Sequence, residues 1–438
     1  MSKEEDVDFD VIVVGAGPAG SVAATLLARA GHSVVLIERG ETPGSKNLSG
    51  GVLYGRVLDK VHPGWIQQAP VERIITRNVI TFMTATGKVA VDAVDPSLGD
   101  PANGVTVLRA KFDAWLAERA ESEGAFLMPG VKVDALLREE TEGGTARVVG
   151  VRAGEDELHS SVVVLADGVN SFLGREAGLR PRPQTNQQAV GIKAVVRLGA
   201  QTIEDRFGVD GIHGAAHALV GDCTKGVGGG GFMYTNKDSI SIGLVLRLDD
   251  LVAKERDAVT LFEDFLRHPA IAPYLEGGEI IEYGSHLVNE GGLEMMGDLQ
   301  GAGYVMVGDA AGLTLNTGLT VRGMDLAIGS GICAARAIHK ALSSGDCSAE
   351  SLGLYRKLLD ASFVGKDMRT YAKAPAFLER PRMYEQYGPL VADVLHRVFD
   401  LDTTPREHLL ATARKALRDS PVKMRDLVSD GIAGVKAL

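Results

Sequence analysis

Cysteine is scarce in this chain, which holds only Cys223, Cys333 and Cys347 among its 438 residues. The three are far apart and form no Cys-x-x-Cys pair, so the sequence predicts no disulfide framework. An iron–sulfur cluster usually needs four cysteine ligands, and three dispersed thiols cannot supply them. His213 and His217 stand four residues apart, but no acidic third ligand is spaced near them. We therefore expect no metal site in this chain.

Long apolar runs are missing as well. No stretch of 18 apolar residues occurs, so the sequence predicts no membrane-spanning helix. The first ten residues contain five acidic residues and no apolar stretch, which predicts neither a secretory signal nor a transit peptide. We expect a cytoplasmic protein, and peripheral contact with the cytoplasmic membrane stays open.

Positive charge is also in deficit. The chain has 46 Lys and Arg against 57 Asp and Glu, a net charge of −11. Such a balance argues against nucleic acid as the main partner. Residues 351–438 are the exception, because they hold 15 basic and 11 acidic residues and carry a net charge of +4. This basic C-terminal region predicts a second surface with its own partner.

Glycine is abundant instead, with 54 residues, and its clearest cluster lies near the N-terminus. Residues 11–14 are an apolar run typical of a buried strand, and Gly-Ala-Gly-Pro-Ala-Gly follows at 15–20. Residues 21–30 predict a helix and residues 33–37 a second strand. In this context a glycine-rich turn binds a dinucleotide, whose pyrophosphate lies at the helix N-terminus. The candidate contacts are Gly15, Gly17, Pro18, Ala19, Gly20, Glu38 and Arg39, with Glu38 expected to bind a ribose diol.

Two later strand ends determine which dinucleotide is expected. One strand ends at Asp167 and Gly168, and another ends at Gly308 and Asp309. Both segments resemble those of glutathione-reductase-type flavoproteins, in which an aspartate just after a strand binds the ribityl chain of FAD. We therefore predict FAD rather than NAD. Arg109 is either a contact of the FAD diphosphate or a surface arginine that precedes a helix expected at 112–123.

Four further segments are similar to the FixC family, the flavoprotein members of the electron-transfer-flavoprotein:quinone oxidoreductase group. They are residues 44–51, 231–239, 286–292 and 316–325. The resemblance covers roughly residues 9–380 and implies an FAD that accepts electrons from electron-transfer flavoprotein subunits and passes them toward quinone. The flavin would carry the redox chemistry, without a catalytic side chain. To cofactor binding the resemblance adds Lys46, Asn47, Ser49, Gly50, Gly51, Gly318, Leu319 and Val321.

The same resemblance implies partners. FixC-type chains lack the iron–sulfur module of the longer single-chain oxidoreductases, and the four cysteines of that module are absent here. A separate ferredoxin-like iron–sulfur subunit is therefore implied, and in some complexes electron bifurcation. A helix that begins near Met324 is expected to direct its positive N-terminal end toward the pyrimidine edge of the flavin.

Together these segments predict an α/β protein with a glutathione-reductase-type FAD-binding fold, an inserted mixed β-sheet domain and a helical C-terminal region. The FAD-binding parts are expected at 1–70, 109–182 and 291–345. The substrate or quinone parts are expected at 71–108 and 183–290, and the helical region at 346–438. Within that last region, Arg414, Lys415 and Arg418 could bind anionic lipid, dock the ferredoxin-like subunit or remain solvated.

Two other functions fit the same patterns. One is an FAD-dependent prenyl reductase or aromatic hydroxylase that uses NAD(P)H, and the other is a structural flavin-bearing assembly subunit. Rapid direct oxidation of NAD(P)H would favour the first, and bound FAD without redox turnover the second. A second glycine cluster, Gly226 to Gly231, matches Gly-x-Gly-x-x-Gly by letter but precedes a strand where a helix is required. We interpret it as a flexible loop.

Overall fold

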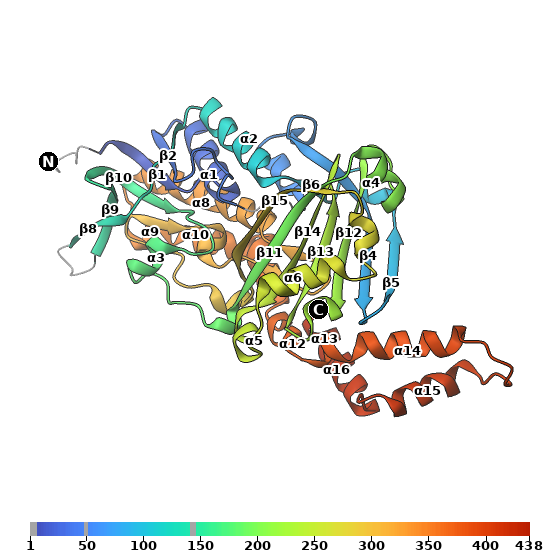
Figure 1. The fold of residues 1–438 in the computed structure, drawn as a ribbon. Coiled ribbons are helices and arrows are strands. Elements are labelled where there is room, and N and C mark those ends of the chain that lie inside the picture. The colour runs from blue at the N-terminus through green and yellow to red at the C-terminus, as the bar shows by residue number, and fades with distance from the viewer. Residues whose placement is uncertain (1–6, 48–50, 141–145) are drawn as a thin grey trace.

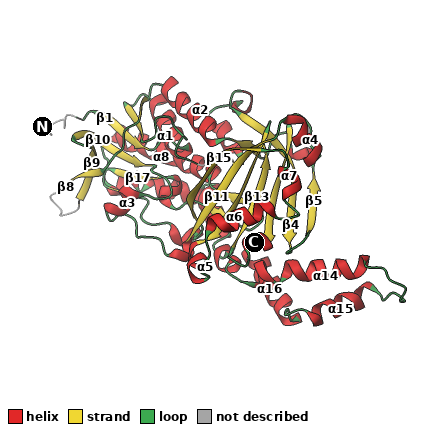
Figure 2. Ribbon diagram, in the orientation of Figure 1, coloured by secondary structure: helices red, strands yellow, loops and turns green. Residues whose placement is uncertain are grey.

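Two large β-sheets lie side by side in the protein, with helices around them and a helical arm at one end (Figure 1). The structure, a computed structural model, describes residues 7–47, 51–140 and 146–438. Strands of both sheets run through the body, whereas the C-terminal part is helical (Figure 2). The predicted α/β class with a helical C-terminal region is confirmed.

The first sheet has a parallel centre made of apolar strands. β10, β1 and β2 pair in parallel, and β17 and β7 continue the sheet in parallel on either side. Residues 11–13 and 162–165 are completely buried, as expected for strands that are covered on both faces. Its strands are β1 (Phe9–Val14), β2 (Val34–Glu38), β7 (Phe126–Pro129), β8 (Ala135–Glu140), β9 (Ala146–Ala153), β10 (Asp156–Leu165), β16 (Gln300–Gly301) and β17 (Tyr304–Met306).

Two helices rich in small residues pack against each other beside this sheet. α1 (Pro18–Arg29) begins three residues before the predicted start, because proline is favoured in the first helical turn. α8 (Met324–Ser344) crosses it closely. A Cβ atom on Gly331 would lie 2.5 Å from the carbonyl oxygen of Ala19. The two helices therefore approach at a distance that only glycine at this position allows.

The second sheet is mixed. Its strand order is β15-β11-β14-β13-β12-β4-β6-β3, in which β12 and β4 are parallel and the other neighbours are antiparallel. Segments far apart in the chain thus form one sheet, and β3, from the segment assigned to FAD binding, also joins it. Its strands are β3 (Gly51–Leu53), β4 (Val71–Met83), β5 (Lys88–Val94), β6 (Val105–Val107), β11 (Gln188–Arg197), β12 (His213–Gly221), β13 (Gly229–Thr235), β14 (Ser239–Arg247) and β15 (Glu279–Asn289).

The second glycine cluster is more ordered than the sequence predicted. Gly229 to Gly231 belong to β13 and pair with β14, so the predicted loop is wrong for this half of the cluster. Gly229 has a φ of +137°, and a Cβ there would lie 1.9 Å from the carbonyl oxygen of Val245. The glycines allow close strand pairing, and β13 continues as a strand where a dinucleotide motif would need a helix.

The chain after Gly345 is helical, as predicted. α14 and α15 form a hairpin that projects from the body, and α16 returns to pack near α12 (Figure 1). Asp430 of α16 is buried and pairs with Arg380, Arg382 and Tyr387. The helices are α9 (Ala349–Leu352), α10 (Leu354–Ala361), α11 (Phe363–Thr370), α12 (Ala374–Leu378), α13 (Arg382–Glu385), α14 (Tyr387–Phe399), α15 (Leu409–Asp419) and α16 (Met424–Ala437). Within the described ranges, none of the helices combines the length and apolarity needed to cross a bilayer.

Candidate FAD site

The glycine-rich turn between β1 and α1 has one open position and two closed ones. Gly15 has a φ of +107°, and a Cβ there would lie 2.3 Å from the Ala166 carbonyl oxygen. A Cβ on Gly20 would lie 2.0 Å from the carbonyl oxygen of Gly15. At Gly17 the nearest atom to a Cβ is the Arg109 Nη2, at 3.9 Å. Gly15 and Gly20 are thus required by the turn itself, whereas Gly17 leaves free space.

That free space lies at the N-terminus of α1, where Gly17 is the N-cap. No side chain caps the helix, and its first turn contains no acidic residue. The free N–H groups and the positive end of the helix dipole therefore favour an anion such as a pyrophosphate. The open cradle at Gly17 fits the FAD that the sequence predicts.

Glu38 holds this turn from the end of β2. Its Oε2 accepts a hydrogen bond from the Ala16 N–H at 3.0 Å, and its Oε1 accepts one from the Gly40 N–H at 2.7 Å. A carboxylate oxygen can accept a second hydrogen bond. Glu38 can therefore fix the turn and still bind a ribose diol, which stays a prediction. Arg39 is exposed beside it.

Arg109 is half-buried and paired within the site rather than lying free on the surface. Its Nε and Nη2 form a bidentate pair with Asp113 one turn later, at 2.8 and 2.7 Å. The Asn47 Nδ2 also donates a hydrogen bond to Asp113 Oδ2, at 3.4 Å. α2 (Arg109–Ser122) thus connects the turn at Gly17 with the segment after β2. Asp113 was not predicted, although an acid four residues after an arginine is a recognisable signal.

The rest of the 44–51 segment is only partly described. Lys46 is exposed, and Ser49 and Gly50 lie outside the described residues. Gly51 begins β3, and a Cβ there would lie 3.3 Å from Met324 Cε at the start of α8. This segment and the α8 N-terminus therefore lie together, as cofactor contacts from both would require.

The turn after β17 carries Asp309 and is held from two sides. The Arg180 Nη1 donates to the carbonyl oxygens of Asp309 and Ala310, at 3.1 and 2.7 Å. The Asn289 Nδ2, at the end of β15, donates to the Asp309 carbonyl oxygen at 3.1 Å. Gly308 also donates its N–H to the Ser330 Oγ of α8, at 2.9 Å. Sequence reasoning missed Arg180 and Asn289, because their partners are backbone atoms far away in the chain.

The Asp309 carboxyl group lies near several basic side chains. Burial raises its pKa, and the charges of Arg109, His286 and Arg180 oppose the rise. Arg109 therefore lies near both predicted contact regions, the turn at Gly17 and the turn at Asp309. Its guanidinium group is close to Gly17, and its charge acts on Asp309. The structure thus brings the pyrophosphate turn and the predicted ribityl contact to one site.

Asp167 marks the second strand end. Burial raises its pKa to about 6, against one hydrogen bond accepted from the Leu173 N–H at 3.1 Å. Among the described residues, Asp167 Oδ1, Ser171 Oγ and Arg180 Nη2 are buried polar atoms without a hydrogen-bond partner. Buried polar atoms usually have partners. These donors and acceptors fit a polar ligand group or an ordered water near the predicted FAD site.

Gly318, Leu319 and Val321 belong to a small hairpin before α8, formed by β18 (Leu315–Asn316) and β19 (Val321–Arg322). Gly318 and Leu319 lie in its turn, and Val321 begins β19. Gly318 has a φ of +77°, which the turn requires. Leu319 and Val321 are 60% and 53% exposed. Their predicted contact with FAD is not visible in the packing of the chain itself and stays a prediction.

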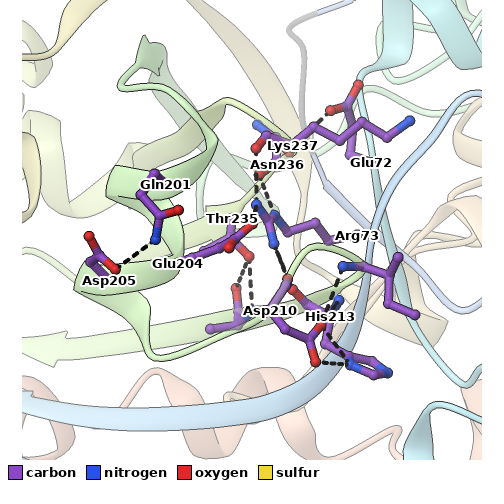
Figure 3. A network of polar contacts seen from close by, with 12 residues as sticks. Glu72, Arg73, Gln201, Glu204, Asp205, Asp210, His213, Thr235, Asn236 and Lys237 are labelled. Atoms are coloured by element: carbon purple, nitrogen blue, oxygen red, sulfur yellow. Dashed lines mark hydrogen bonds and ion pairs between the residues drawn. The ribbon is translucent and has the colours of Figure 1, made fainter.

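His213 and His217 both lie on β12, and they are not arranged as ligands of a metal. His213 pairs with Asp210 at 2.9 Å, beside the buried Arg73, which donates to backbone carbonyls of Asp210, His213, Asn236 and Lys237 (Figure 3). Burial lowers the pKa of His217 to about 4. Within the described residues, no group of three or more His, Cys, Asp or Glu side chains is placed to hold a metal. The polar network around Arg73 connects strands and loops of the second sheet.

The fold and this site define an FAD-dependent oxidoreductase. The FAD binding domain family matches residues 8–218. The ubiquinone-binding region of ETF-QO matches residues 189–288, and the ETF-QO/FixC family C-terminal domain matches residues 374–438. The predicted FAD cofactor is confirmed at the level of the domain.

Similar proteins specify the family. The probable electron transfer flavoprotein-quinone oxidoreductase YdiS of Escherichia coli (strain K12) is 46% identical over 439 residues, 99% of this chain and 100% of YdiS. Protein FixC of Salmonella typhi is 43% identical over 442 residues, with the same coverage. The chain belongs to the FixC/YdiS-type family of electron-transfer-flavoprotein:quinone oxidoreductases, which confirms the predicted family.

Solved structures support the fold alone. A geranylgeranyl bacteriochlorophyll reductase-like protein of Thermoplasma acidophilum superimposes with a TM-score of 0.70 at 21% identity, covering 96% of this chain and 99% of that one. The myxobacterial chondrochloren halogenase CndH gives a TM-score of 0.62 at 19% identity, covering 98% and 90%. Both share the overall fold of this chain.

Proposed function

We propose that the chain accepts electrons from an electron-transfer flavoprotein through its FAD and passes them to a quinone. The observation that carries this proposal is the full-length similarity to YdiS and FixC, which spans the candidate FAD site and the second sheet alike. The ubiquinone-binding match falls on residues 189–288, which build β11 to β15 of that sheet. The names of the relatives indicate the donor and acceptor, and the position of the two sheets side by side supports the transfer.

The side of the second sheet that faces away from α6 (Ala258–Arg267) offers a surface for a flat, largely apolar ring. Phe232 and Tyr234 of β13 stack there, with ring centroids 5.0 Å apart and planes 19° apart. Ala216 and Ala218 lie directly opposite them on β12. Small residues beside stacked aromatic rings leave room for an aromatic or quinone ring to pack. We place the quinone on this side of the sheet.

The chain's own part in the reaction is to bind and orient. FAD supplies the redox chemistry when bound, and the surrounding protein groups tune it. Gly17 and Arg109 would hold its diphosphate, Glu38 a ribose and Asp309 the ribityl chain. The proposed transfer requires no catalytic acid–base pair, because electrons move between cofactors.

We further propose that the chain works with a separate ferredoxin-like iron–sulfur subunit. The isolated complex can be tested for electron bifurcation. Cys223 and Cys333 are buried and Cys347 is half-buried. Their pKa values are all raised chiefly by burial. Raised pKa values disfavour the thiolate form that binds iron. This supports placing the cluster on another subunit.

The C-terminal arm, α14 and α15, is the candidate for contact with that subunit or with a cytoplasmic membrane surface. Leu401 and Leu410, near the turn of the hairpin, are 71% and 63% exposed. Of the basic run, Lys415 pairs with Glu407 at 2.5 Å, whereas Arg414 is exposed. Replacing Arg414, Lys415 and Arg418 by Gln and measuring liposome flotation and subunit pull-down at two salt concentrations separates the two contacts. Unchanged signals in both assays would make the run a solvated face.

Stopped-flow reduction of the bound FAD tests the proposed electron donor. Reduced electron-transfer flavoprotein should bleach the flavin absorbance much faster than NADH or NADPH does. A faster reaction with NADPH would move the function to the prenyl reductase or aromatic hydroxylase alternative. Bound FAD that no donor reduces, and that no quinone reoxidises after chemical reduction, would indicate a structural flavin-bearing subunit.

A further inference from the structure

Lys193 lies on the cofactor side of the second sheet. It belongs to β11, whose neighbouring residues Ile192, Ala194 and Val196 enter the apolar core beneath α6. Side chains alternate between the two faces of a strand. Lys193 therefore points to the opposite face, the one that bears Phe232 and lies nearer to the candidate FAD site.

The neighbouring strands make room for this lysine. Gly243 of β14 and Gly284 of β15 stand directly opposite Lys193 in the two ladders. A Cβ on Gly243 would lie 2.6 Å from the Lys193 Cβ and 2.5 Å from the Phe232 Cζ. The glycine at this position thus allows the lysine stem and the aromatic ring to lie side by side. The half-buried lysine has a defined position in the sheet.

Arg109 lies near both Lys193 and the candidate FAD site. The Arg109 guanidinium group lies over Gly17, and its charge acts on both Asp309 and Lys193. Its own charge is largely matched by the bidentate pair with Asp113. Lys193 is therefore a second cation near the two predicted cofactor contacts, supplied by the other sheet.

Burial and the charged groups around Lys193 determine the pH range over which it loses its charge. Burial is the main cause that lowers its pKa, to about 7, and the charge of Arg109 on α2 adds to this. Glu282 of β15 acts in the opposite direction, and β15 also carries His286 on the same face. β14 presents Ser241, Gly243 and Val245 there, which carry no charge.

We propose that the Lys193 ammonium group stabilises the negative charge that the cofactor gains on reduction and so raises the midpoint potential of the bound FAD. A cation in a half-buried site acts more strongly than one in water, because the surroundings screen it less. Charge near the flavin is one of the means by which a protein tunes it. The proposal rests on FAD occupying the candidate site, but on neither the electron donor nor the quinone.

The test uses the FAD-loaded chain in spectroelectrochemical titrations at pH 7. K193Q should lower the equilibrium constant for reduction about tenfold, which is about 30 mV for a two-electron couple. K193R, which keeps the charge, should stay near wild type. The matched control is R197Q, which removes a charge from the exposed end of the same strand, where Arg197 pairs with Glu279. R197Q should leave the potential unchanged.

The difference between wild type and K193Q should narrow as the pH rises from 6 to 9, because Lys193 loses its charge over this range. Equal potentials for wild type and K193Q, or equal losses in K193Q and K193R, would overturn the proposal, the latter because it indicates packing rather than charge. Purified protein without flavin absorbance would instead contradict FAD binding itself.

A second measurement covers the case in which K193Q does not fold or retain FAD. Reductive ¹³C-methylation of the folded wild-type protein gives a lysine NMR signal for each ammonium group, and the signal missing in K193R identifies Lys193. Its pKa should rise by about one unit or more on reduction of the FAD, since linkage is reciprocal. An unchanged pKa in the two redox states would refute the role.

Discussion

Gly17→Ala separates binding of the cofactor from folding of the turn. The free chain has room for this methyl group, because the nearest atom to a Cβ at Gly17 is the Arg109 Nη2 at 3.9 Å. The same space is the one that we assign to the FAD pyrophosphate. The substitution should therefore leave the apoprotein folded and weaken FAD binding.

The expected magnitudes follow from the position of Gly17 as the N-cap of α1. Alanine is a poorer N-cap than glycine, which should cost about 1 kcal/mol or less in stability. A phosphate pushed away from one helix N–H loses a charge-assisted hydrogen bond of about 1.5–3 kcal/mol. FAD binding should therefore weaken about 10- to 150-fold.

The assay titrates FAD into apoprotein and follows quenching of the flavin fluorescence, alongside thermal melting of the apoprotein. Two further glycine-to-alanine variants serve as controls. Gly431→Ala, on α16, meets no atom within 4 Å and should leave FAD affinity unchanged. Gly20→Ala should impair folding itself, because its Cβ would lie 2.0 Å from the Gly15 carbonyl oxygen. Wild-type FAD affinity in Gly17→Ala would refute the assigned position of the pyrophosphate. An unfolded Gly17→Ala apoprotein would refute the statement that the chain has room for a methyl group there.

Three more predictions follow from contacts of the described residues. Asp309→Ala should lower FAD occupancy of the purified protein, measured by flavin-to-protein absorbance, and unchanged occupancy and potential would contradict the ribityl contact. Arg180→Gln should also weaken FAD binding, by about tenfold, because the Asp309 turn loses two hydrogen bonds at a buried site; wild-type affinity would remove Arg180 from the site. Asp430→Asn should loosen α16, seen as faster amide exchange confined to the C-terminal helices. Pairing with Arg382 lowers the pKa of Asp430, so the stabilisation of α16 by Asp430 should be complete above about pH 4 and be lost as the pH falls further. Amide exchange that does not change with the substitution would show that the pair does not hold α16.

Local sequence determined the elements at the candidate FAD site. The run of apolar residues at 11–14, the glycines that follow and the acid at 38 predict β1, α1 and β2, and the structure has these elements in that order. The physical reason is that a buried parallel strand, a tight turn and a helix N-terminus each require particular residues at adjacent positions. Motifs such as Asn316 to Asp325 also indicated the family, because they are specific and contiguous.

Tertiary structure decided what meets at the site. Arg180 and Asn289 hold the Asp309 turn through its carbonyl oxygen, and a backbone acceptor leaves no mark on the sequence. The second glycine cluster is half strand, since pairing with β14 overrides its resemblance to a loop. The charge of Arg109 acts on Lys193 only because segments from separate parts of the chain pack together. Hydrogen bonds and charges between distant residues depend on this packing, whereas the sequence specifies only neighbours along the chain.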